Sequence, residues 1–269
     1  MSNYICVTCG VQYEEGDSPS AGCPICEDDR QYVGWGGQKW TTLDEMRTSY
    51  KNVVEEDEPG LIGITTEPGF GIGQRARLIL SPGGNVLWEC ISLIDEATVE
   101  AVRARGGIAA ISISHPHMYA SMVEWSKAFD NAPIYLHEDN RQWVMRMTPN
   151  VAFWSGEQHL IADGLTLVRC GGHFPGSTVL HWAGGAEGKG ALLTGDTIYV
   201  VQDRRYVSFM YSYPNHIPLN ASAVRRIVDA VEPFEFDRLY SSWKERVVAS
   251  GAKEAVRRSA ERYLLAIEG

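Results

Sequence analysis

Two histidines one residue apart, His115 and His117, follow the short apolar segment "IAAISIS". Side chains at positions i and i+2 of an extended segment point the same way, so both imidazoles can bind one cation. Two solvated loop histidines would give the same pattern. Metal binding is favoured by two later segments, which carry His173 in the turn "GGHFPGS" and Asp196 at the end of the apolar run "ALLTGD".

Four of the six cysteines lie within the first 26 residues, in the pattern Cys6-x2-Cys9 and Cys23-x2-Cys26. Two such pairs supply four thiolates, which suit Zn²⁺ or iron. The knuckles "CVTCG" and "CPIC" resemble the rubredoxin-like module of rubrerythrins. We therefore predict a four-cysteine metal-binding module over residues 1–40 with a structural zinc, and an electron-carrying iron is the alternative. The metal is expected to stabilise a module this small.

The order of the remaining motifs resembles that of the metallo-β-lactamase superfamily, over about residues 61–269. These motifs are His-x-His, then Gly-His-x-x-Gly-Ser, then Leu-x-x-Gly-Asp. The resemblance implies an α/β fold, the αβ/βα sandwich, with its metals at the lip between two sheets. It also implies that His115, His117 and His173 bind the first metal. Asp196 matches the carboxylate that bridges two metals in the family.

The ligands that the family reserves for a second metal are missing. The family motif is His-x-His-x-Asp-His, and this chain has Tyr119 and Ala120 in place of the aspartate and the last histidine. Ser242 and Trp243 stand where a later histidine is expected. A phenol with a reference pKa near ~10 is a poor substitute for a carboxylate, and alanine binds no metal. We therefore expect a mononuclear site.

One cation in such a site predicts a hydrolase, in which metal-bound hydroxide attacks an ester, lactone, thioester or amide. Asp196 would bind the metal or accept the proton of the water, and Tyr119 would donate a hydrogen bond to the developing oxyanion or the leaving group. His216 is a weaker candidate for moving protons. Two alternatives remain: an iron oxidoreductase, because His115, His173 and Asp196 match the ligands of persulfide dioxygenases, and a non-catalytic binding protein.

Aromatic side chains are dense after Asp196 and elsewhere in the later part of the chain. They predict an apolar pocket for a small, partly apolar substrate, with four candidate binding residues: Trp154, Phe174, Tyr199 and Trp243. Filling of the core is the alternative role for these side chains. His137 and His159 are interpreted as structural, and Cys90 and Cys170 as buried and inert.

The elements that must position these residues follow from local patterns. We expect a helix and an acidic linker over residues 41–60, with the helix near 42–54 and the acidic break "EEDEPG" at 55–60. Alternating strands and helices are expected over 61–269. A helix over 95–106 begins with acids and ends with arginines, and a helix over 220–234 has Asn220 as its N-cap. A long helix is expected to close the chain over 251–269.

The charge and the apolar pattern limit the partners. The net charge is −10, and residues 1–60 hold 12 acidic and 4 basic side chains. No long basic run could follow a phosphate backbone, so nucleic acid is not expected. The absence of a signal-like start and of a long apolar segment predicts a cytoplasmic protein with no membrane partner. A small-molecule substrate is the expected partner, and a homo-oligomer is left open.

Overall fold

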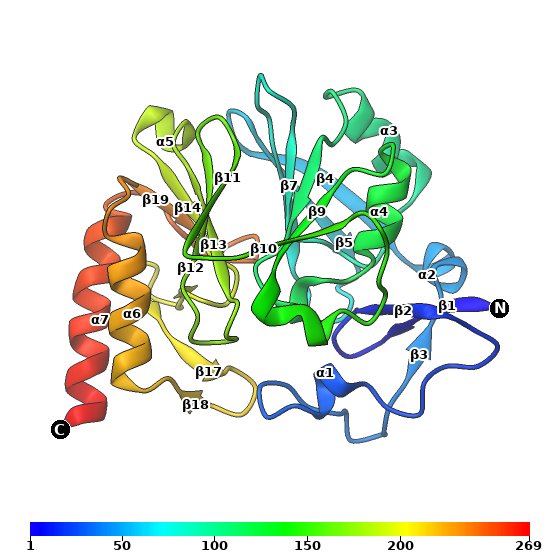
Figure 1. Ribbon diagram of the computed structural model, residues 1–269, viewed down its shortest axis with the longest axis horizontal. Coiled ribbons are helices and arrows are strands. Elements are labelled where there is room, and N and C mark those ends of the chain that lie inside the picture. The colour runs from blue at the N-terminus through cyan, green and yellow to red at the C-terminus, as the bar shows by residue number, and fades with distance from the viewer. The chain divides into compact units, whose positions relative to one another are not determined.

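The computed structural model describes residues 1–269, which divide into two compact units. Unit 1 comprises Met1–Leu136 and Arg141–Phe153, and unit 2 comprises His137–Asn140 and Trp154–Gly269. Each unit contains one large β-sheet (Figure 1). None of the helices is both long and apolar enough to cross a membrane.

The sheet of unit 1 has seven strands. In spatial order they are Val151–Trp154 (β10), Ile134–His137 (β9), Ala110–Ser112 (β8), Val86–Trp88 (β7), Arg75–Ile79 (β6), Leu61–Glu67 (β5) and Lys51–Glu58 (β4). Strands β4 to β7 pair antiparallel, whereas β7, β8 and β9 are parallel. The parallel strands are joined by the helices Glu96–Arg103 (α3) and Met122–Ala128 (α4), as parallel pairing requires.

Strand β4 corrects one prediction, because residues 55–60 were expected to form a linker. Instead, residues up to Glu58 pair with β5. The acidic side chains of β4 neutralise arginines from β6: Asp57 lies 2.7 Å from Arg75 Nη2 and 3.1 Å from Arg77 Nε. Both arginines are almost completely buried. The room for Arg75 comes from Gly63 on β5, since a Cβ there would overlap the guanidinium group.

The cysteine-rich segment forms a three-stranded sheet, in the order β2-β1-β3, with one short helix. Its elements are Ser2–Cys6 (β1), Gln12–Gly16 (β2), Pro24–Glu27 (α1) and Trp40–Thr41 (β3). The helix Leu43–Ser49 (α2) follows, and it begins with a capping box formed by Thr42 and Glu45. Ile5 of β1 packs with Met46, Phe70 and Leu93, so the module shares a small core with the rest of unit 1.

The sheet of unit 2 has six strands. In spatial order they are Gln158–Ala162 (β11), Leu165–Arg169 (β12), Thr178–Trp182 (β13), Ala191–Leu193 (β14), Arg238–Tyr240 (β19) and Val247–Val248 (β20). Two small ribbons pair Tyr199–Val200 (β15) with Val207–Ser208 (β16), and Met210–Ser212 (β17) with Ile217–Pro218 (β18). Gly185–Gly188 (α5) is a single short turn.

Two helices lie side by side in unit 2, Ala221–Val231 (α6) and Ala252–Glu268 (α7) (Figure 1). Apolar side chains from both helices form one core with residues of β14 and β19. The predicted N-cap of α6 is confirmed: the side chain of Asn220 accepts a hydrogen bond of 2.9 Å from the backbone N–H of Ala223.

Candidate metal centres

The four clustered cysteines meet in unit 1 with the geometry of a tetrahedral metal site. Their sulfur atoms all lie within 4.8 Å of one another. Cys6 Sγ is 3.6 Å from Cys26 Sγ, and Cys9 Sγ is 3.7 Å from Cys23 Sγ. Metal–sulfur bonds of about 2.3 Å in a tetrahedron place the sulfur atoms about 3.8 Å apart. All four side chains are buried, so these residues fit a bound metal.

Two neighbouring side chains donate hydrogen bonds to the sulfur atoms. Tyr13 Oη lies 3.0 Å from Cys23 Sγ, and Gln38 Nε2 lies 3.1 Å from Cys6 Sγ. Hydrogen bonds among the sulfur atoms, first that with Cys23, lower the pKa of Cys6, whereas burial raises the pKa of Cys9. Because a metal needs thiolates, its binding would release protons from this cluster.

The histidine pair of unit 1 lies in a tight turn directly after β8. His115 is the N-cap of a 3-10 turn over Pro116–Met118, which includes His117. The two rings are 5.1 Å apart at an angle of 79°, and each offers a ligand nitrogen within 4.8 Å of the other. Both side chains are buried. The structure therefore brings together the two imidazoles that the His-x-His pattern predicted.

A buried carboxylate and a hydroxyl group fix the ring of His115. Ser114 Oγ donates to Glu89 Oε1 at 2.5 Å, and the backbone N–H of Ser114 donates to Glu89 Oε2 at 3.1 Å. Since its proton is directed to Glu89, Ser114 Oγ accepts from Nδ1 of His115 at 2.7 Å. This arrangement leaves Nε2 of His115 to bind a metal. The sequence analysis missed Glu89, and no local motif indicates it.

The second pair of predicted ligands lies in unit 2. His173 Nδ1 donates to the carbonyl oxygen of Tyr211 at 2.9 Å, so the other nitrogen, Nε2, is left as the ligand atom. That nitrogen is 3.8 Å from Asp196 Oδ2, which is too long for a hydrogen bond. Two ligands that are each about 2.1 Å from one cation lie roughly 3.4 Å apart in a tetrahedron and roughly 3.6 Å apart at 120°, so the observed separation is within a few tenths of an ångström of a shared site. The pair therefore fits two ligands of one metal.

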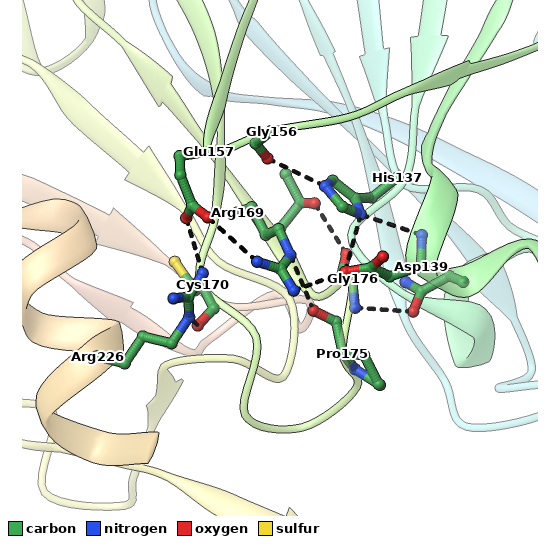
Figure 2. Close-up of polar contacts among 11 residues, drawn as sticks. His137, Asp139, Gly156, Glu157, Arg169, Cys170, Pro175, Gly176 and Arg226 are labelled. Atoms are coloured by element: carbon green, nitrogen blue, oxygen red, sulfur yellow. Dashed lines mark hydrogen bonds and ion pairs between the residues drawn. The ribbon is translucent and has the colours of Figure 1, made fainter. Parts of the chain in front are cut away.

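Two arginines hold the loop that carries His173 at both of its ends (Figure 2). Arg226 Nε of α6 donates to the carbonyl oxygen of Cys170 at 3.2 Å. Arg169 Nε, at the end of β12, donates to the carbonyl oxygen of Pro175 at 3.2 Å. Both bonds restrict the backbone on either side of the imidazole, so we interpret these arginines as positioning residues.

Acidic side chains orient the same two arginines. Glu157 pairs with Arg226 at 2.7 Å and with Arg169 at 3.2 Å, and Figure 2 shows it between them. Arg169 also pairs with Asp139 at 2.6 Å, and the backbone N–H of Asp139 donates to Nδ1 of His137 at 3.2 Å. His137 thus has a place in a polar network of unit 2, which agrees with its interpretation as structural.

An aromatic cluster adjoins Asp196. Tyr213 Oη donates to the backbone oxygen of Asp196 at 2.9 Å, and burial together with the nearby carboxylate raises the pKa of Tyr213 well above its usual value. Tyr199 lies 4.7 Å from Tyr213 and 5.3 Å from Trp243 between ring centroids. Arg246 stacks over Tyr199 at 5.5 Å. Two of the four predicted binding residues, Tyr199 and Trp243, therefore pack together.

Of the other predicted residues, Trp154 and Phe174 are buried and His216 is exposed. Trp154 packs between His137 and His159, with ring centroids 4.6 and 5.7 Å away. Phe174 is completely buried, 5.1 Å from the ring of its neighbour His173. His216 is exposed on the turn between β17 and β18. A role in substrate binding for Trp154 and Phe174, and a role in proton transfer for His216, stay predictions.

The residues that replace the second metal's ligands have distinct surroundings. Tyr119 is 1% exposed, and with Val11 and Met145 it lines a space that has no room for water. Ala120 is buried with a φ of 45°. The hydroxyl group of Ser242 is buried and forms no hydrogen bond within the protein, and the same holds for that of Thr197 beside Asp196. A buried hydroxyl group without a protein partner needs water or a ligand. The sequence analysis did not indicate Thr197.

Comparison with solved structures assigns the fold. VMB-1 superimposes on this chain with a TM-score of 0.61 and 12% identity, over 81% of this chain and 98% of VMB-1. DIM-1 metallo-β-lactamase gives a TM-score of 0.61 and 13% identity, over 80% of this chain and 98% of DIM-1. The predicted fold class, the metallo-β-lactamase sandwich with a small N-terminal four-cysteine module, is confirmed.

A relative in sequence places the chain in a family. YmaE, an uncharacterized protein of Bacillus subtilis strain 168, is 51% identical over 269 residues, which are 99% of this chain and 97% of YmaE. The chain therefore belongs to the same family as YmaE. The models of known protein families give no match.

Proposed function

We propose that this protein is a metal-dependent hydrolase with one divalent cation, held jointly by His115, His117, His173 and Asp196. One observation carries the proposal most directly. Nε2 of His173 faces Asp196 Oδ2 at 3.8 Å, while its Nδ1 is held by a backbone carbonyl group. Two buried groups at this separation are arranged as ligands of a shared cation rather than as a hydrogen-bonded pair.

The pair of unit 1 supports the same cation in the same way. The ring of His115 is fixed by Ser114 through Nδ1, and His117 lies beside it in the same buried turn. Each of the four residues offers one buried ligand atom. The order of the motifs along the chain matches the order in metallo-β-lactamases, whose fold this chain shares. Zn²⁺ suits three imidazoles and one carboxylate.

A divalent cation bound in this way would lower the pKa of a bound water to about 7 and so would supply a nucleophile for hydrolysis at neutral pH. The side chains would orient the cation and the substrate and would move protons. Asp196 would orient the cation or accept a proton, and Tyr119 would donate a hydrogen bond to the developing oxyanion. The buried hydroxyl groups of Thr197 and Ser242 would bind polar atoms of the substrate.

The substrate class follows from the same surroundings. The cluster of Tyr199, Tyr213 and Trp243 presents aromatic surface next to Asp196. It favours a small, partly apolar ester, lactone, thioester or amide. The second-metal positions, occupied by Tyr119, Ala120 and Ser242, support a mononuclear centre.

A substrate panel tests the proposal. Purified, zinc-loaded protein is assayed against ester, lactone, thioester and amide substrates, together with His173→Ala and the matched control His181→Gln. His181 lies outside the proposed site, and glutamine can keep its hydrogen bond to the carbonyl oxygen of Glu235. We expect activity in wild type and in the control and its loss, by about 10²-fold or more, in His173→Ala. Equal activity in His173→Ala would contradict the assignment.

The metal found in the preparation separates the alternatives. Zinc in the histidine site supports hydrolysis. A coloured, iron-loaded histidine site that consumes oxygen with a persulfide substrate would instead support the oxidoreductase. A histidine site that takes up no divalent metal would support a binding protein that has lost its chemistry.

A further inference from the structure

The four-cysteine module lies against the loop that carries His115 and His117, and both belong to unit 1. The backbone N–H of Gln12 donates to the carbonyl oxygen of Ala120 at 3.0 Å. Gln12 comes three residues after the metal ligand Cys9, and Ala120 comes three residues after His117. One backbone hydrogen bond therefore joins the two metal-binding segments.

Ala120, which accepts this hydrogen bond, has an uncommon backbone conformation. Ala120 has a φ of 45°, in the left-handed region that residues with a Cβ rarely adopt. Such a conformation persists where the surrounding structure holds it. Ala120 and Gln12 are both almost completely buried, and the packed space lined by Val11, Tyr119 and their neighbours has no room for water. The hydrogen bond between Gln12 and Ala120 is therefore shielded from water and held in place by its surroundings.

Further contacts hold the segment around Cys9 and Gly10 against the rest of unit 1. Ser92 Oγ donates to the carbonyl oxygen of Gly10 at 2.7 Å, and Gly10 directly follows Cys9. Gly71 lies so close that a Cβ there would be 3.3 Å from the backbone nitrogen of Gly10. On the other side, Arg146 bonds the side chain of Gln12 and also pairs with Glu124 of α4 at 2.5 Å.

We propose that the four-cysteine module is a positioning element for the histidine pair. Metal in the four-cysteine centre fixes residues 9–12, and the N–H of Gln12 then holds Ala120 and the turn of His117 in the metal-binding conformation. Occupancy of the four-cysteine centre consequently raises the metal affinity of the histidine site. This inference rests on the proposed function, because it presupposes that the histidine site binds a cation.

A pair of variants separates the role of the backbone N–H of Gln12 from that of its side chain. Gln12→Pro removes the N–H donor, whereas the matched control Gln12→Ala keeps the donor and removes the side chain, with its hydrogen bond from Arg146. Both are prepared as full-length protein, and Zn²⁺ affinity of the histidine site is measured by competition with a chromophoric chelator while zinc in the four-cysteine centre is counted. We expect about ten-fold or greater weakening in Gln12→Pro and less than about three-fold change in Gln12→Ala.

Hydrogen exchange of residues 115–124 gives a readout that needs neither activity nor the histidine metal. Faster exchange of this segment in Gln12→Pro, with the four-cysteine centre still loaded, supports the positioning role. Unchanged affinity and unchanged exchange would overturn it. If wild type itself binds no metal at the histidines, the proposed function fails and the affinity part of the inference fails with it, while the exchange comparison still decides whether the N–H of Gln12 holds the turn of His117 in place. If Gln12→Pro does not fold, Ser92→Ala is measured in its place, with the same two outcomes.

Discussion

Glu89 and His115 are joined by a single hydroxyl group. Ser114 Oγ is 2.5 Å from Glu89 Oε1 and 2.7 Å from His115 Nδ1, and all three side chains are buried. The carboxylate orients the hydroxyl group, which in turn orients the imidazole. Glu89 itself has a φ of 62°, so its backbone conformation is also uncommon for a residue with a side chain.

Glu89→Gln should weaken metal binding at the histidine site by about 10–100-fold, because one oxygen that accepts from Ser114 becomes an amide donor. Zinc in the four-cysteine centre should be unaffected. The measurement is Zn²⁺ competition with a chelator. Glu100→Gln, which changes an exposed carboxylate of α3, is the control and should match wild type. Wild-type affinity in Glu89→Gln would show that the ring is fixed by other contacts.

Arg169→Ala should loosen the loop that carries His173. It removes the bond to the carbonyl oxygen of Pro175 together with the pairs to Asp139 and Glu157. We expect a loss of about 1–2 kcal/mol in the free energy of unfolding, since the guanidinium is only partly exposed, and weaker metal binding. Urea unfolding measures the first effect, and chelator competition measures the second.

Arg225→Ala is the matched control for that loop variant, because Arg225 has only an exposed pair with Glu268. Its loss should change the free energy of unfolding by less than about 0.5 kcal/mol. Equal effects of the two substitutions would contradict a positioning role for Arg169.

Asp57→Asn should destabilise unit 1, because it leaves the buried guanidinium groups of Arg75 and Arg77 with less compensating charge. Removal of one partner from a buried ion pair costs about 3–5 kcal/mol, and the partial exposure of Asp57 places this case at the lower end. Urea unfolding measures the change. Glu56→Gln, on the exposed face of the same strand, should have almost no effect. A small effect at Asp57 would show that Glu55 neutralises both arginines.

This ion-pair cluster also marks what the sequence could not predict. Residues 55–60 were interpreted as an acidic linker because the sequence does not show their partners. These partners lie on a strand about 20 residues away, and only the folded sheet brings Asp57 to Arg75. Helix starts were predictable because their signals are local: Asn220 accepts from the N–H of Ala223 at 2.9 Å, as predicted. Asp95, one of the acids expected at the start of its helix, accepts from the N–H of Thr98 at 2.8 Å. Burial of a charged residue depends on contacts that no single segment encodes.

The candidate site shows the same contrast. His115, His117, His173 and Asp196 were predicted because their motifs match those of the metallo-β-lactamase superfamily in type and order. Glu89 was missed, since its role depends on two hydrogen bonds from Ser114, which join the residues that follow the parallel strands β7 and β8. No periodicity or motif predicts a contact of that kind.

Alkylation should distinguish the cysteines by their surroundings. Burial raises the pKa of Cys170 to about 12 and that of Cys90 well above its usual value, so neither forms the reactive thiolate at pH 8. Chelation removes the metal that is expected to stabilise the small module, so the module should open and expose its buried cysteines. Iodoacetamide should then form adducts at Cys6, Cys9, Cys23 and Cys26, as mass spectrometry would detect. Metal-loaded protein should gain almost none. Rapid modification of Cys90 or Cys170 in folded protein would contradict their burial.

Metal stoichiometry tests the central claim most directly. Full-length protein saturated with zinc and freed of excess metal is analysed by elemental analysis, next to His173→Ala and to a double variant, His115→Ala with His117→Ala. We predict two zinc ions per wild-type chain, one in the four-cysteine centre and one at the histidines, and one zinc ion per chain in both variants. Three zinc ions in wild type, or two retained in the variants, would contradict a single cation held by these residues.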